Sequence, residues 1–260
     1  MTRLPKSVRQ ALSAALRAAL VAALATLPLL APAQRKVEDT LAERTRACTA
    51  CHGEQGRAGP DGYYPRLAGK PAGYLHHQLR NFAEGRRHYG LMTRLVDPLS
   101  DAYMAEIAAY FSQLHLPYPA PTASRLPPEQ LARGQRIVQQ GDPTRGLPAC
   151  AQCHGERLTG VQPNVPGLLG LPLDYLNAQL GAWQTGQRQA LAPDCMKAVL
   201  QHIAPGDVIA VSNWLASQPL PADTRPAAAP ARAVTDPAWR CGSAPELAAH
   251  VATRAQGAPK

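Results

Sequence analysis

The positions of apolar residues along the chain predict a series of short helices. Over residues 101–114 apolar side chains recur three and four positions apart, which places them on one face of an α-helix. The same spacing predicts helices over 129–140 and 207–218. Less regular patterns predict three more helices, over 37–46, 73–83 and 174–183. The segments between them are rich in Gly and Pro, so the pattern as a whole predicts an all-α protein.

The first 33 residues have the pattern of a secretory signal peptide. Basic residues at Arg3, Lys6, Arg9 and Arg17 precede an apolar stretch over 18–30, and Ala31-Pro32-Ala33 has the small-x-small pattern of a cleavage site. The apolar stretch is shorter than the ~20 residues that a membrane-spanning helix needs. We therefore predict a signal peptide over 1–33 and export to the periplasm. A retained N-terminal anchor is the alternative.

The rest of the chain contains an internal duplication. A shift of 101–104 residues aligns Pro65-x-Leu67-x-Gly69 with Pro166-x-Leu168-x-Gly170. It also aligns Cys48 with Cys150, Tyr74 with Tyr175, Gln78 with Gln179, Arg87 with Arg188, and Met92 with Met196. So many matches in register indicate two copies of one domain, separated by a proline-rich stretch at 116–128 that cannot be helical. We predict domains over 34–120 and 121–222, followed by a Pro/Ala-rich C-terminal extension over 223–260.

Each copy carries the pattern Cys-x-x-Cys-His. The two motifs consist of Cys48, Cys51 and His52, and of Cys150, Cys153 and His154. The pattern is typical of covalent haem attachment, in which two thiols add to the porphyrin vinyl groups and the histidine binds the iron. Two Cys pairs could instead form a tetrahedral zinc site. Zinc gives no reason for a His-Gly after both pairs or for export, so we predict two covalently bound haem c groups.

Composition fits a protein that is built around large cofactors. Only 5% of the residues are aromatic, which is little for a core of this length, and two buried haems would supply much of the missing apolar mass. The formal net charge is +9. Part of this excess lies in the signal segment, and haem propionates would reduce it further. No basic patch is left to support nucleic-acid binding.

These motifs together resemble a known family. The duplicated Cys-x-x-Cys-His, the Pro-x-Leu-x-Gly segment, the Tyr-Leu-x-x-Gln-Leu helix and the Met before each final helix are similar to the dihaem cytochrome c4 family of class I cytochromes c. The resemblance covers about 37–220. It implies two tandem class I cytochrome c domains, each with a few helices around a haem, a periplasmic location and electron transfer to or from respiratory partners.

The repeat also points to the sixth ligand of each iron. Met92 and Met196 occupy equivalent positions, whereas Met104 aligns with a valine and is predicted to lie in the core. A thioether opposite His stabilises Fe(II) and raises the reduction potential. His88, close to Met92, is an alternative ligand, but its counterpart is not a histidine. The four predicted axial ligands are His52, Met92, His154 and Met196.

Other matched residues are candidates for supporting roles around the haems. Pro65 and Pro166 resemble the proline of cytochromes c whose carbonyl accepts the proximal His ring N–H, a contact that fixes the ring. Two further pairs could hold the haem propionates through charge or hydrogen bonds: Arg87 and Arg188, and Tyr74 and Tyr175. For the arginines the alternative is a solvated surface charge.

Two cysteines lie outside the haem motifs. Cys195 and Cys241 form an even pair in an exported protein, which predicts a disulfide. Two free thiols are one alternative. A Cys195 thiolate on the iron is another, because Cys195 directly precedes Met196.

The predicted function is electron transport without a substrate reaction. Donors would be a quinol-oxidising complex or a dehydrogenase, and the acceptor a terminal oxidase; the carrier would be soluble or peripheral to the inner membrane. A subunit permanently bound to one dehydrogenase is a close variant. The competing hypothesis is a dihaem enzyme of the thiosulfate dehydrogenase or peroxidase type, which Cys195 as a sulfur ligand would favour; a ligand-binding or sensor cytochrome is the third.

Overall fold

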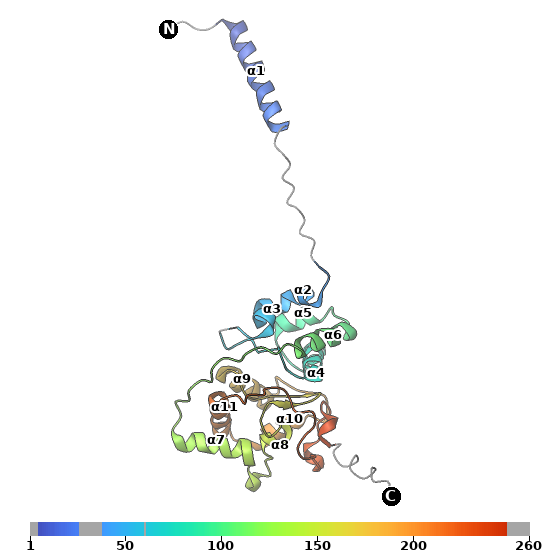
Figure 1. The fold of residues 1–260 in the computed structure, drawn as a ribbon, viewed down its shortest axis with the longest axis vertical. Helices are drawn as coiled ribbons and strands as arrows, with labels where there is room; N and C mark the ends of the chain where they lie inside the picture. Colours follow the sequence, from blue (N-terminus) through green and yellow to red (C-terminus); the bar gives the residue numbers. More distant parts are fainter. Residues whose placement is uncertain (1–4, 26–37, 60, 249–260) are drawn as a thin grey trace. The chain divides into compact units, whose positions relative to one another are not determined.

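The computed structural model describes residues 5–25, 38–59 and 61–248 (Figure 1). The chain divides into two compact units, Met1–Asp39 and Thr40–Lys260. The first contains α1 (Lys6–Ala25), and the predicted cleavage motif at 31–33 lies outside the described residues. In the part of the chain that the structure describes, no helix combines the length and the apolarity that a membrane span requires.

The first half of the second unit is helical. It consists of α2 (Leu41–Arg44), α3 (Arg46–His52), the short 3-10 turn η1 (Glu54–Gly56), α4 (Ala72–Ala83), α5 (Gly90–Val96) and α6 (Asp101–Ser112). Helix α6 begins at a favourable cap, because the Ser100 hydroxyl accepts a hydrogen bond from the Tyr103 backbone N–H at 3.2 Å. Helices α4 and α6 pack on each other through apolar side chains that include Leu75, Phe82, Met104, Ile107 and Phe111.

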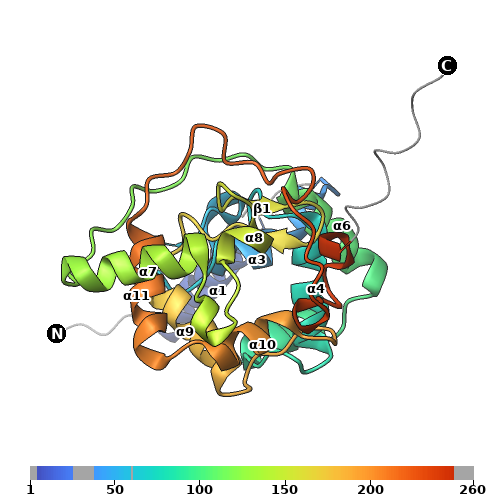
Figure 2. The same ribbon diagram turned by 90° about the horizontal axis from the view of Figure 1, so that it is seen from below.

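The second half repeats this arrangement. It consists of α7 (Pro128–Gln140), η2 (Pro143–Arg145), α8 (Cys150–His154), the strands β1 (Gly160–Val161) and β2 (Val165–Pro166), α9 (Leu173–Gln184), α10 (Cys195–His202) and α11 (Pro205–Ser217). Helices α7 and α11 lie side by side in Figures 1 and 2. They approach closely because Gly134 of α7 lies against the backbone of Ala210, where a larger residue would not fit. The main core cluster of this half includes Ile137, Val138, Leu200, Trp214 and Leu215.

The prediction of an all-α fold is confirmed, because one antiparallel hairpin of two-residue strands is the only sheet among the described residues. Each predicted helix is present within a few residues, except that 37–46 corresponds to two shorter helices, α2 and the beginning of α3. Sequence periodicity missed α5 and α10, which are too short to show it. These are the helices that carry the two aligned methionines.

The C-terminal extension packs on the second half over residues 223–248. It contains the 3-10 turns η3 (Pro237–Trp239) and η4 (Pro245–Ala248). A disulfide joins Cys241 to Cys195 at the start of α10, with 4.9 Å between their Cα atoms. The division between domains at 120 and 121 stays a prediction, because the two halves and the extension belong to one compact unit.

Candidate haem-binding sites

The first Cys-x-x-Cys-His motif forms the last turns of α3. Residues three apart in a helix share one face, so Cys48 and Cys51 lie next to each other, and His52 closes the helix. Gly53 follows with φ 74°, a conformation that ends the helix and suits glycine. Cys51 is exposed, Cys48 is half-buried and His52 is buried. The second motif occupies the whole of α8 in the same way.

Each motif histidine is held by the carbonyl of the aligned proline. The Nδ1 of His52 lies 2.7 Å from the Pro65 carbonyl oxygen, and the Nδ1 of His154 lies 2.7 Å from that of Pro166. A ring that donates from Nδ1 leaves Nε2 as the lone-pair nitrogen available to a metal. Burial lowers the pKa of both histidines, which favours this neutral form.

A single apolar cavity of about 580 Å³ reaches both motifs. Its lining includes His52 and Met92 in the first half and His154 and Met196 in the second. Histidine and methionine are the two side chains that hold iron in low-spin cytochromes c. Cysteines for attachment, an oriented imidazole, a thioether and an apolar wall therefore fit a haem in each half. Met104 instead packs in the core with Phe82 and Val96, as predicted.

The zinc alternative finds no support in the geometry. Among the described residues no three His, Cys, Asp or Glu side chains come together as a metal site. Burial also raises the pKa of Cys150 to about 12 and that of Cys153 to about 11, which disfavours the thiolates that zinc requires.

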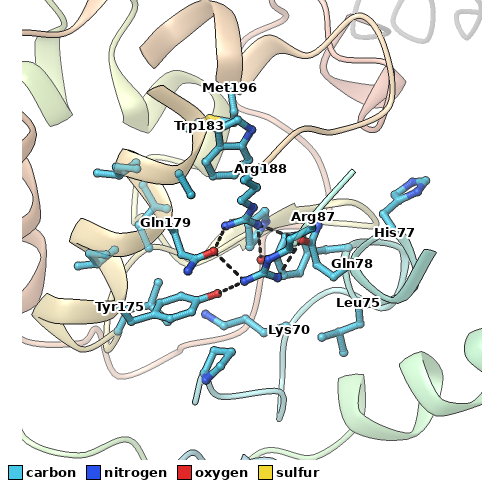
Figure 3. Close-up of a pocket in the computed structure, with 18 of the residues that line it drawn as sticks. Lys70, Leu75, His77, Gln78, Arg87, Tyr175, Gln179, Trp183, Arg188 and Met196 are labelled. Atoms are coloured by element: carbon cyan, nitrogen blue, oxygen red, sulfur yellow. Dashed lines mark hydrogen bonds between the residues drawn. The ribbon is translucent and has the colours of Figure 1, made fainter. Parts of the chain in front are cut away.

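Figure 3 shows how the aligned arginines meet between the two halves. Arg87 donates to Gln179 Oε1 at 2.7 Å and to the Tyr175 hydroxyl at 3.2 Å, both in the other half. Arg188 reciprocates, donating to Gln78 Oε1 at 2.9 Å and to the Tyr74 hydroxyl at 3.4 Å. Each also donates to the glutamine of its own half. The pairs that the repeat aligned thus form one pseudo-symmetric cluster.

The backbone and the electrostatics of this cluster point to an anionic ligand. Arg87 and Arg188 lie opposite each other in an antiparallel bridge, and Gln189 N–H donates to the Arg86 carbonyl at 2.7 Å. The hydrogen-bond partners that the structure gives the two guanidinium groups are neutral. Burial lowers the pKa of Arg188, and the neighbouring charge of Arg87 lowers it further. Both arginines line the cavity, so a carboxylate there would relieve their repulsion.

Comparisons with known proteins agree with this geometry. No protein-family model matches the chain. A thiosulfate dehydrogenase electron acceptor of Thiomonas intermedia is 40% identical over 67% of this chain and 79% of its own. Cytochrome c4 of Pseudomonas aeruginosa is 30% identical over 66% of this chain and 84% of its own. The chain belongs to the cytochrome c4 family.

A solved structure supports the same assignment. The crystal structure of reduced recombinant cytochrome c4 from Pseudomonas stutzeri matches with a TM-score of 0.58 and 29% identity, and the match covers 68% of this chain and 96% of the other. The fold is therefore that of tandem class I cytochrome c domains. Membership of the cytochrome c4 family implies covalently bound haem c and an electron-transfer role.

Among the buried charges beside this cytochrome c4 site that sequence reasoning missed is Lys70. Lys70 is 5% exposed, lines the cavity and donates from Nζ to the Gly167 carbonyl of the other half at 3.1 Å. Burial, followed by the charge of Arg66, lowers the pKa of Lys70 to about 8. The only available signal was an asymmetry of the repeat, because the position equivalent to Lys70 holds Leu171.

The C-terminal extension lies at the second site, where Cys241 is bonded to Cys195 at the start of α10. Trp239, Cys241, Ala244 and Leu247 line the cavity. The Sγ of Cys195, which directly precedes Met196, is bonded to Cys241 and is therefore not free to bind a metal. The predicted pairing of Cys195 with Cys241 thus has its geometric counterpart in the structure, and the bond holds the extension beside the helix that carries Met196.

Proposed function

We propose that the protein is an exported dihaem electron carrier. Cys48 and Cys51 would hold the first haem and Cys150 and Cys153 the second; the axial ligands would be His52 with Met92, and His154 with Met196. The proposal rests above all on the paired contacts of 2.7 Å between each motif histidine and its proline carbonyl. That contact fixes the tautomer and the ring orientation that iron ligation needs.

The bound haems would supply a one-electron Fe(III)/Fe(II) couple in each half. The chain's own residues would tune it: the proline carbonyls orient the imidazoles, and the thioethers of Met92 and Met196 raise the potentials. Arg87 and Arg188, with Tyr74 and Tyr175, would neutralise and hold propionates between the halves. Because one cavity reaches both motifs, the two sites adjoin, which favours direct electron transfer between them.

The relatives suggest the class of donor. Two of them, 40% and 34% identical, are named thiosulfate dehydrogenase electron acceptors. We therefore favour a periplasmic dehydrogenase of an inorganic sulfur compound as the donor over a quinol-oxidising complex, with a terminal oxidase as the acceptor. The basic and apolar N-terminal segment supports export by a Sec-type signal, with the protein free or peripheral to the inner membrane.

The structure removes the main argument for the dihaem enzyme hypothesis. It relied on Cys195 as a sulfur ligand that would make one iron catalytic, and in the structure this sulfur is bonded to Cys241. The described residues around each site also form closely matched sets, with one His, one Pro carbonyl and one Met in each half.

The proposal is tested on protein matured in a host that attaches haem c. Mass spectrometry should find two haems that survive denaturation, on a chain that starts near Gln34. Near-infrared magnetic circular dichroism of the oxidised protein should give His/Met bands for both haems. When the oxidised protein is mixed in a stopped-flow apparatus with a thiosulfate dehydrogenase and thiosulfate, both haems should become reduced. One haem, or a His/thiolate band, would overturn the assignment.

A further inference from the structure

The two haem attachment edges differ in their exposure. In the first half Cys51 is exposed, and a small depression of about 50 Å³ opens there between α3 and α5. The side chains at its rim include Leu91 and Leu95, which are 61% and 40% exposed. This edge is therefore open to solvent and ringed by apolar groups.

The same edge of the second half is covered by residues 223–248, which we call the cover segment. Cys153, the counterpart of Cys51, packs against an apolar cluster that joins β1 and β2 to this segment. Its buried members are Val161, Val165, Val234, Ala244 and Leu247, and Trp239 and Cys241 pack against them. Trp239 also contacts the His202 ring at the end of α10, with 5.3 Å between the ring centroids.

The cover segment is attached at several separate points, so it does not depend on the disulfide alone. Ala227 N–H donates to the Gly160 carbonyl at 2.9 Å, and Gly242 N–H donates to that of Pro193 at 2.9 Å. Glu246 accepts from the backbone and the side chain of Asn164 at 3.2 and 3.0 Å. Gly242 lies against the backbone of Ala192, which leaves no room for a side chain. These contacts hold the segment against the second site over most of its length.

We propose that the cover segment shields the second haem edge, so that electrons enter and leave the protein through the edge at Cys51. This inference rests on the proposed electron-carrier function and adds a direction to it. With haem bound in each half, one electron would leave a donor redox protein, which would be oxidised by one equivalent, and would reduce one Fe(III) to Fe(II) in the first half. A second one-electron step would pass it to the second half, and neither step would need a proton. The cover segment would also keep water away from the second haem and so raise the potential of that haem.

The test compares full-length variants of the cover segment. Leu247→Asp places a carboxylate in the buried cluster and should detach the segment; Thr235→Asp, at an exposed position of the same segment, introduces the same charge as a control. The double variant Cys195→Ala, Cys241→Ala loosens the segment by another route, should Leu247→Asp fail to fold. In Leu247→Asp, redox titration should give a lower potential for one haem, and in Thr235→Asp neither potential should change.

Direct exchange at the second haem is measured in a Met92→His background. This change lowers the first potential, so the second haem can no longer be oxidised rapidly through the first. After reduction and mixing with excess hexacyanoferrate(III), stopped-flow absorbance should show a slow second phase. Adding Leu247→Asp should accelerate that phase several-fold, and adding Thr235→Asp should not.

The outcomes separate this inference from the proposed function. Unchanged potentials in Met92→His alone would contradict the assignment of Met92 as an iron ligand. The shielding role of the cover segment would then be tested by redox titration of Leu247→Asp alone. Two results would contradict the shielding role of the cover segment. One is an unchanged potential of the second haem in Leu247→Asp. The other is a slow phase that Leu247→Asp does not accelerate, in a Met92→His background where the first potential is lowered.

Discussion

The Nζ of Lys70 donates a hydrogen bond of 3.1 Å to the carbonyl oxygen of Gly167, across the boundary between the two repeated halves. Gly167 directly follows Pro166, whose carbonyl holds the His154 ring. Burial is the largest cause that lowers the pKa of His154, and the charge of Lys70 adds to it. The first half thus places the Lys70 ammonium group near the second site, whereas the equivalent residue of the second half, Leu171, carries no charge.

Replacing Lys70 by leucine should lower the potential of the second haem more than that of the first. A nearby positive charge destabilises Fe(III) relative to Fe(II), so its removal favours the oxidised form. A tenfold change in the Fe(III)/Fe(II) ratio corresponds to about 59 mV for one electron, and we expect a shift on this order. Spectroelectrochemical titration measures it. Lys70→Arg keeps the charge and should shift the potential of the second haem much less. Equal shifts at both haems in Lys70→Leu would contradict the assignment of the Lys70 charge to the second site.

Replacing either aligned methionine by histidine should lower one potential and leave the other nearly unchanged. The imidazole stabilises Fe(III) where the thioether stabilised Fe(II). Met92→His and Met196→His should each remove half of the far-red sulfur-to-iron absorption of the oxidised protein. Met104→Leu, in the core of α6, is the control and should keep that band. A full band in either histidine variant would show that its methionine is not a ligand.

Removing the disulfide should destabilise the second half selectively. Cys195 and Cys241 close a loop with a sequence separation of 46 residues. The chain-entropy model gives a stabilisation of about 4 kcal/mol for a loop of that length, as an upper value. Urea unfolding of Cys195→Ala, Cys241→Ala, followed by haem circular dichroism, should show a lower midpoint for one transition. Non-reducing peptide mapping of the wild-type protein should find the cross-link; two alkylatable thiols would contradict it.

The second half should lose stability in acid because of Asp142. This buried carboxylate accepts from the Thr144 hydroxyl at 2.6 Å and pairs with Arg133 at 2.6 Å. The Thr144 hydrogen bond, then Arg133, lowers the pKa of Asp142 from 3.8 to about 2. Since the folded pKa lies below the unfolded one, this stabilisation is complete above about pH 4 and is lost as the pH falls towards 2.

Urea unfolding between pH 2 and 7 tests this dependence. Asp142→Asn should be less stable at neutral pH and should lose less of its free energy of unfolding across the acid range. Asp97→Asn, at an exposed position of the first half, is the control. Parallel pH curves for the wild type and Asp142→Asn would assign the acid sensitivity to other groups.

The sequence by itself determined the chemistry that depends on local spacing. Two thiols three residues apart with a histidine next to them share one helical turn wherever that helix lies, so α3 and α8 could be read directly from their motifs. The duplication added the aligned prolines and methionines, because a contact that recurs in both copies leaves a matched pair in the sequence. The helices α4, α6, α7, α9 and α11 followed from apolar periodicity.

Only the tertiary structure decided what lies between the halves and which side chains of the extension pack against the second site. Arg87 and Arg188 were expected to hold propionates, and in the structure each crosses to the glutamine and tyrosine of the other half. Lys70 reaches a carbonyl 97 residues away, and the cover segment seats Leu247 near Cys153. No local pattern encodes such contacts, because they depend on how two folded surfaces meet, and the free energy that selects them comes from burying both surfaces together.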